Sequence, residues 1–221
     1  MDKIMKAMIW AAGLGERMQP LTLKTPKPLL KIGEHALIEH HLYRLAAAGF
    51  KDVVINIHHM AEQVISQLGD GQKYQLNIKY SKEDDLLDTG GGTVNALPLL
   101  GAEPFVIISS DIYSDFDFKT LPTKLDGLVH LVLTNNPDFH PDGDYALQAD
   151  GKISLQGDKL NYAGVAVLDP TILQQFPQKK FPISKLFEKA IADKVATGQF
   201  FSGTWHNVGT PEQLSLLNGQ S

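Results

Sequence analysis

Short apolar runs alternate with segments of helical periodicity through the first half of the chain. Runs that indicate buried strands lie near 5–12, 53–57, 76–80 and 104–109, and helical patterns lie near 35–48, 60–68 and 91–99. This alternation is typical of βαβ units, which build a mostly parallel sheet. Shorter segments after residue 115, separated by turn residues, predict antiparallel additions, and two helices are expected near 183–193 and 211–218.

The length of 221 residues is enough for one domain with a substantial core, so we expect a single domain over residues 1–221. No cysteine is present, which excludes disulfides, thiolate metal sites and a cysteine nucleophile, and the composition suits a cytoplasmic protein. No apolar stretch reaches the roughly 20 residues of a membrane-spanning helix. A net charge of -5, with positive charge confined to one loop, makes nucleic acid a poor partner.

That loop follows the first apolar run and is rich in glycine and proline. It carries four cationic side chains, Arg17, Lys24, Lys27 and Lys31. A locally reversed charge in an acidic chain indicates a bound polyanion. Ligands of open parallel sheets bind at the carboxyl ends of the strands, which is where this loop begins.

Gly13 and Gly15 open the loop without completing either common nucleotide fingerprint, because Met18 replaces the third glycine and no Gly-Lys-Ser/Thr ending follows. Glycines let backbone amides approach an anion closely, and Arg17 offers a forked, permanently charged donor. An ordinary tight turn explains the glycine pair equally well. The two prolines that bracket Lys27 favour the binding interpretation, because they reduce the entropy lost when its ammonium group is held against a ligand.

Two later segments suggest further parts of a site. Three glycines at residues 90–92 precede a helical pattern, and the free amides of a helix N-terminus favour anions; a flexible loop is the alternative. Residues 105–111 form an apolar strand that ends in the carboxylate of Asp111, a position well suited to hold Mg²⁺ beside phosphates. A turn or capping aspartate is the alternative for Asp111, and the segment alone does not decide.

Residues 11–18 (Ala-Ala-Gly-Leu-Gly-Glu-Arg-Met) and 25–29 (Thr-Pro-Lys-Pro-Leu) resemble the signature of the sugar-1-phosphate nucleotidyltransferases. Residues 87–92, 162–165 and 205–210 extend this resemblance over nearly the whole chain. It implies a Rossmann-like, three-layer α/β/α domain with a mixed, mostly parallel sheet. It also implies an enzyme that joins a nucleoside triphosphate to a sugar 1-phosphate and releases pyrophosphate. The short length and the glycine triplet most resemble the branch that uses UTP and N-acetylmuramate 1-phosphate in cell-wall recycling.

The resemblance also implies roles for individual residues. Gly13, Gly15 and Arg17 would bind the triphosphate, and Lys27 would neutralise the α-phosphate, which makes Arg17 and Lys27 the catalytic pair. Asp111 would hold Mg²⁺. Ala12 and the segment around Asp84 are expected to border the ribose and base, and the residues expected to face the sugar are Ser109, Asp144 and Gly164. Asp144 could equally be a hairpin turn residue.

Three departures from the family pattern affect these expectations. Asn207 stands where many relatives carry a second metal-binding aspartate, and an amide oxygen is a weaker ligand than a carboxylate. No Glu-Lys-Pro segment is present, so the cation that binds the sugar phosphate is unassigned. Ser109 and Ser110 replace an expected asparagine and glycine, which leaves the sugar open. A mannose-1-phosphate guanylyltransferase is the alternative enzyme, a non-catalytic sugar-nucleotide sensor is the alternative class, and the oligomeric state is not indicated.

Overall fold

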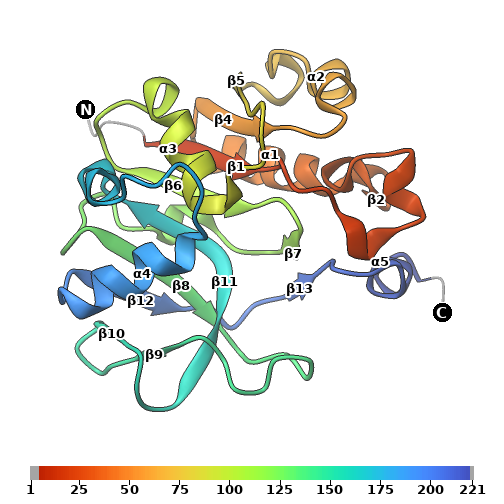
Figure 1. Ribbon diagram of the computed structural model, residues 1–221. Helices are drawn as coiled ribbons and strands as arrows, with labels where there is room; N and C mark the ends of the chain where they lie inside the picture. Colours follow the sequence, from red (N-terminus) through yellow and green to blue (C-terminus); the bar gives the residue numbers. More distant parts are fainter. Residues whose placement is uncertain (1–4, 220–221) are drawn as a thin grey trace.

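The computed structural model describes residues 5–219 (Figure 1). The strands are β1 (Lys6–Trp10), β2 (Lys31–Ile32), β3 (His35–Ala36), β4 (Asp52–Ile57), β5 (Asn77–Lys82), β6 (Phe105–Ser109), β7 (Ile112–Ser114), β8 (Val129–Thr134), β9 (Tyr145–Leu147), β10 (Ile153–Ser154), β11 (Lys159–Leu168), β12 (Ala196–Phe200) and β13 (Trp205–Asn207). The α-helices are α1 (Leu37–Ala47), α2 (Ala61–Leu68), α3 (Asp88–Leu100), α4 (Ile183–Ala192) and α5 (Pro211–Leu217). The predicted alternation of strands and helices is confirmed.

Within residues 5–219, nine strands form one mixed sheet. Its parallel part has the order β6-β1-β4-β5, and α1, α2 and α3 are the crossover helices between successive strands. β11 then pairs antiparallel with β6 and β8, as expected for the second half, but β12 adds parallel to β8. The result is the predicted three-layer α/β/α architecture with a mostly parallel sheet.

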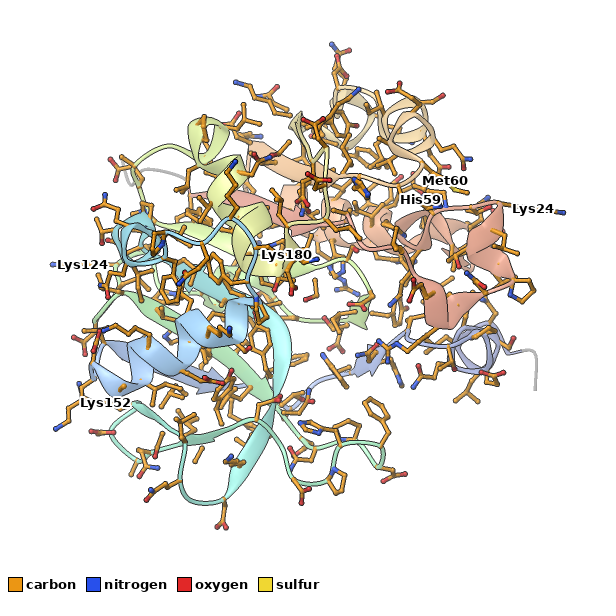
Figure 2. All side chains as sticks on the ribbon, viewed as in Figure 1. Lys24, His59, Met60, Lys124, Lys152 and Lys180 are labelled. Atoms are coloured by element: carbon orange, nitrogen blue, oxygen red, sulfur yellow. The ribbon has the colours of Figure 1, made fainter. Side chains whose placement is uncertain are left out.

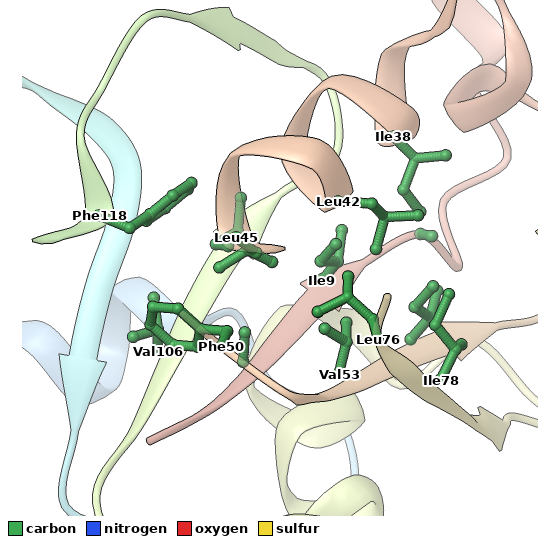
Figure 3. Close-up of a cluster of buried hydrophobic side chains, with 14 of the residues drawn as sticks. Ile9, Ile38, Leu42, Leu45, Phe50, Val53, Leu76, Ile78, Val106 and Phe118 are labelled. Carbon is green, nitrogen blue, oxygen red and sulfur yellow. The ribbon is translucent and has the colours of Figure 1, made fainter. Parts of the chain in front are cut away.

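Side chains alternate along the central strand β1 and divide the core into two clusters. Ala7 and Ile9 point into a cluster with α1 and α2, and Figure 3 shows this cluster around Ile9, Leu42 and Leu45. Met8 and Trp10 point to the opposite face, into a cluster with α3 and α4. A strand buried on both faces reads as a continuous apolar run, which is why the sequence predicts this one well.

The C-terminal helix α5 packs against the N-terminal loop. Met18 and Leu30 of the loop share a third buried cluster with Val208 and Leu214. The Asn218 side chain accepts a hydrogen bond from the Gly33 amide at 2.9 Å and donates one to the Lys31 carbonyl at 3.0 Å. The C-terminal part of the chain therefore holds the cationic loop in place.

β7 and β13 form a small antiparallel sheet that the sequence analysis missed. The register places Asn207 opposite Ile112, and the Val208 amide donates to the Asp111 carbonyl at 2.8 Å. Strands of three residues are too short to show a period in the sequence. This ladder brings residue 207 next to residue 111, although the two are far apart along the chain.

Among residues 5–219, no helix has both the length and the apolar character that crossing a bilayer would require.

The buried side chain of His41, in α1, predicts that stability falls in mild acid. Burial and the neighbouring His40 lower the pKa of His41 from 6.5 to about 4. The unfolded chain then binds the proton more readily, so the stabilisation by neutral His41 is complete above about pH 6.5 and is lost as the pH falls toward 4. Its contribution at pH 5 should be about 2 kcal/mol smaller than at pH 8.

Urea unfolding at pH 8 and pH 5 measures this loss. His41→Gln should flatten the pH dependence, and His59→Gln, at an exposed position, should leave it as in the parent. The remaining slope in His41→Gln is expected from His40 and His130, whose pKa values are also lowered by burial. An unchanged slope in His41→Gln contradicts the prediction.

Candidate active site

A cavity of about 700 Å³ lies at the carboxyl ends of β1, β4, β5 and β6. This is the edge at which open parallel sheets bind ligands, and the volume suits a molecule the size of a nucleotide sugar. The lining combines the loop after β1, the segment after β6, and the first turn of α3. The predicted site residues on the lining are Ala12, Gly13, Gly15, Arg17, Lys27, Ser109 and Asp111.

Glycine is needed at position 15 for a local reason. Its φ is +65°, and a Cβ there would lie 2.9 Å from Thr22 and 3.1 Å from Lys27. The Thr22 hydroxyl donates to the Gly15 carbonyl at 2.8 Å and fixes the turn. By contrast, a Cβ on Gly13 would meet nothing within 4 Å, so the backbone at Gly13 is open to the cavity.

Lys27 and Asp111 form an ion pair inside the cavity. Lys27 begins a short 3-10 helix (Lys27–Leu29), with Pro26 before it and Pro28 inside it, as the bracketing prolines led us to expect. Its ammonium nitrogen lies 2.6 Å from the Asp111 carboxylate, and the two side chains are 12% and 28% exposed. The residue expected to neutralise the α-phosphate and the residue expected to hold Mg²⁺ are therefore in contact, although they are 84 positions apart.

Only two of the four loop cations reach the cavity lining. Arg17 is exposed and lines the cavity together with Lys27. Lys24 and Lys31 are exposed and lie outside the lining, and Figure 2 shows Lys24 extending away from the molecule at its edge. Two cationic side chains of this loop, Arg17 and Lys27, thus face a ligand in the cavity, and the other two do not.

The donor atoms beside Asp111 fit a magnesium ion. The Oδ1 atom of Asn207 is buried and has no hydrogen-bond partner among the described residues. The β7–β13 ladder holds the backbone of residues 207 and 208 beside that of residues 111 and 112. Asn207 itself lies outside the cavity lining, whereas Asp111 is part of it. Carboxylate and amide oxygens are hard ligands that suit Mg²⁺. In residues 5–219 no group of three or more His, Cys, Asp or Glu could hold a metal, so phosphate oxygens of a substrate would have to complete the coordination.

Two buried polar residues on the lining are Asn56, which was not predicted, and Glu83, which was covered only as a neighbour of Asp84. The Asn56 side chain accepts from the Ala11 amide at 2.8 Å and donates to the Glu83 carboxylate at 2.7 Å. That carboxylate also accepts from the Leu87 amide at 3.1 Å. These bonds tie the end of β1 to the segment before α3. The available signal was the position of both residues at the carboxyl ends of predicted strands.

The remaining predicted residues lie outside the lining. Asp84 is exposed, while its neighbour Glu83 faces the cavity. Asp144 accepts from the Tyr162 amide at 2.7 Å and from His140 at 3.1 Å, which is how a turn-anchoring residue behaves. Gly164 has φ +78°, and a Cβ there would lie 2.7 Å from Ile112. Gly164 thus lets β11 approach the strand after Asp111, and any part in sugar binding stays a prediction.

The expectation of free amides at the glycine triplet is wrong. The triplet lies inside the first turns of α3, and the amides of Gly90 and Gly91 both donate to the Phe181 carbonyl, at 2.9 Å and 3.3 Å. A segment distant in sequence has therefore taken the donors that an anion would need.

Comparison with known proteins identifies the family of this chain. The sequence profile of the nucleotidyl transferase family matches residues 6–127. N-acetylmuramate alpha-1-phosphate uridylyltransferase of Neisseria meningitidis is 39% identical, covering 93% of this chain and 94% of that protein. The protein of the same name from Caulobacter vibrioides is 34% identical, covering 93% and 92%. Mannose-1-phosphate guanyltransferase of Schizosaccharomyces pombe is 28% identical, covering 95% of this chain and 62% of its own length.

The fold has close counterparts among solved structures. A Bacillus anthracis protein, described provisionally as a glucose-1-phosphate thymidylyltransferase and solved with sucrose, superposes with a TM-score of 0.86 at 22% identity, covering 97% of this chain and 94% of that one. Given a profile match over more than half of the chain and relatives of 39% and 34% identity over almost all of it, this protein belongs to the nucleotidyl transferase family and is a sugar-1-phosphate nucleotidyltransferase.

Proposed function

We propose that the protein transfers UMP from UTP to N-acetylmuramate 1-phosphate, giving UDP-N-acetylmuramate and pyrophosphate in the recycling of cell-wall sugars. The observation that carries this choice of substrates is the 39% and 34% identity to two uridylyltransferases of that name over nearly their full lengths. The guanyltransferase relative is less similar and considerably longer than this chain.

The proposed reaction is a displacement at the α-phosphorus of UTP. An oxygen of the sugar phosphate forms a bond to the α-phosphorus, the bond to the β-phosphate oxygen breaks, and the electron pair leaves with pyrophosphate. The second pKa of a phosphate monoester is about 6, so the nucleophile is already anionic at neutral pH and needs no general base. The protein must supply alignment and positive charge.

Lys27 is suited to stabilise charge at the α-phosphate, because it is held by Asp111 and by the backbone between two prolines. Arg17 and the open backbone at Gly13 would bind the rest of the triphosphate, with Gly15 shaping the turn. Ala12 would border the ribose and base, and Ser109 would face the sugar. Asp84, Asp144 and Gly164 do not line the cavity and would act only through the residues next to them.

Asp111 and Asn207 would hold Mg²⁺. When bound, the ion would offset negative charge on the phosphate oxygens that complete its coordination. The protein's contribution is the ladder between β7 and β13, which holds the backbone at residue 207 beside the backbone at residue 111 before any substrate arrives.

A substrate panel tests the proposal. The purified protein is incubated with Mg²⁺, each of UTP, GTP, dTTP and ATP, and each of N-acetylmuramate 1-phosphate, N-acetylglucosamine 1-phosphate and mannose 1-phosphate, and pyrophosphate release is measured. We expect the highest kcat/KM for UTP with N-acetylmuramate 1-phosphate. A preference for GTP with mannose 1-phosphate would overturn the proposal and identify the alternative enzyme.

A further inference from the structure

Residues 179–181, just before α4, are held against the first turn of α3 by their backbone. The Phe181 carbonyl accepts the amides of Gly90 and Gly91, and the Phe181 amide donates to the Leu87 carbonyl at 3.3 Å. The Phe181 ring is buried and stacks on Phe176 with centroids 4.9 Å apart. These hydrogen bonds and the buried ring therefore fix the position of residues 179–181.

The glycine triplet is what permits this contact. A Cβ on Gly91 would lie 2.1 Å from the Lys179 carbonyl oxygen, and one on Gly90 would lie 2.3 Å from the Phe181 ring. Real Cβ atoms essentially never approach within 3.0 Å, so any side chain at these positions would push the segment away. The position of residues 179–181 at the cavity thus depends on glycine at 90 and 91.

Lys180 is the residue of this segment that lines the cavity. In Figure 2 it lies near the centre of the view, whereas Lys24, Lys124 and Lys152 extend outward from the edges. No hydrogen bond or ion pair of its ammonium group is formed with any other described residue. Lys27, the lining lysine of the N-terminal loop, is already paired with Asp111. Lys180 is thus a charged group without a partner among the described residues, and it lines a part of the cavity that the N-terminal loop does not form.

The acceptor of the proposed function carries two anionic groups. Its phosphate must lie at the α-phosphorus, where the N-terminal loop supplies positive charge. Its lactyl ether ends in a carboxylate, attached to the hexose away from the phosphate. Lys180 is exposed where it lines the cavity, and its ammonium group is free to form a charge-assisted hydrogen bond with such a carboxylate. We propose that Lys180 determines acceptor specificity by binding this carboxylate. The inference rests on the proposed function, because it concerns the acceptor named there.

Kinetics with two acceptors test this role. N-acetylmuramate 1-phosphate is compared with its carboxamide, in which the carboxylate is neutral and the rest of the molecule is unchanged. We expect Lys180→Ala to raise KM for the acid about 10-fold, to leave KM for UTP unchanged, and to remove any preference for the acid over the carboxamide. The difference should shrink as salt is raised, because the pair is partly exposed.

Lys179→Ala is the matched control, since it removes an exposed charge one position away whose side chain lies outside the lining. It should leave KM for both acceptors as in the parent, and Lys180→Arg should retain the preference. If the parent turns over N-acetylmuramate 1-phosphate and Lys180→Ala has the same KM for it, the inference is overturned and the proposed function stands. An equal rise in KM for the acid and the carboxamide also overturns the inference, because it would assign Lys180 to the phosphate. Absence of parent turnover with N-acetylmuramate 1-phosphate overturns the proposed function and the inference with it.

Discussion

Replacing Lys27 by alanine should lower kcat by about 10²- to 10³-fold, the usual cost of removing one preorganised donor from developing charge. Lys27 is nearly buried, is fixed between Pro26 and Pro28, and lies 2.6 Å from Asp111. Its loss removes positive charge from the α-phosphate and leaves the Asp111 carboxylate without its partner. Both effects act on the transition state more than on substrate binding, so kcat should change more than KM for UTP. Steady-state pyrophosphate release measures both constants.

Lys24→Ala is the control for net charge in the same loop. Lys24 is exposed and outside the cavity lining, so its removal should change kcat less than about 2-fold. An equal fall in kcat in the two variants would mean that the loop acts through its total positive charge, and the specific role of Lys27 would then be rejected.

Asp111→Asn should lower activity by about 10²-fold or more and raise the Mg²⁺ concentration needed for half-maximal rate. The change removes the negative charge from the pair of proposed metal ligands and leaves two neutral amides, those of residues 111 and 207, to hold the ion. Asn207→Asp should keep or raise activity and lower the Mg²⁺ requirement, because it adds a carboxylate at the same place. Titration of the rate with Mg²⁺ at saturating UTP gives both quantities.

Asp115→Asn is the matched control, because Asp115 is exposed, follows β7, and lies outside the lining. It should match the parent in rate and in Mg²⁺ dependence. A parent-like rate and Mg²⁺ dependence for Asp111→Asn would refute the metal assignment.

Local patterns were enough to predict most elements of the fold. Strand β1 is buried on both faces from Ala7 to Trp10 and appears there as a continuous apolar run, and α1 shows a clear helical stripe. The three-residue strands β7 and β13 were missed because their stability comes from pairing with each other and not from their own sequences. The same reason explains why the proximity of Asn207 to Asp111 could be expected from a family resemblance but not from the residues themselves.

The errors in the site have a common cause. Asp84 and Glu83 are adjacent acids after β5, and only the register of that strand decides which of them faces the cavity. The triplet at residues 90–92 was expected to offer free amides, but those amides are bonded to Phe181. Whether a donor is free depends on every segment that can reach it, and that information is not local.

By itself, the sequence determined the alternation of strands and helices and the chemistry of the loop that holds Arg17 and Lys27. The spacing of apolar residues and the positions of glycine and proline affect backbone conformation over only a few residues, so they can be interpreted locally. Tertiary structure alone decided which cations reach the cavity and that Lys180 is part of its lining. It also decided that Asn56 and Glu83 link the end of β1 to the segment before α3 by hydrogen bonds. These outcomes depend on contacts between segments that are tens of residues apart. Such contacts are set by how the layers pack, and no short stretch of sequence encodes them.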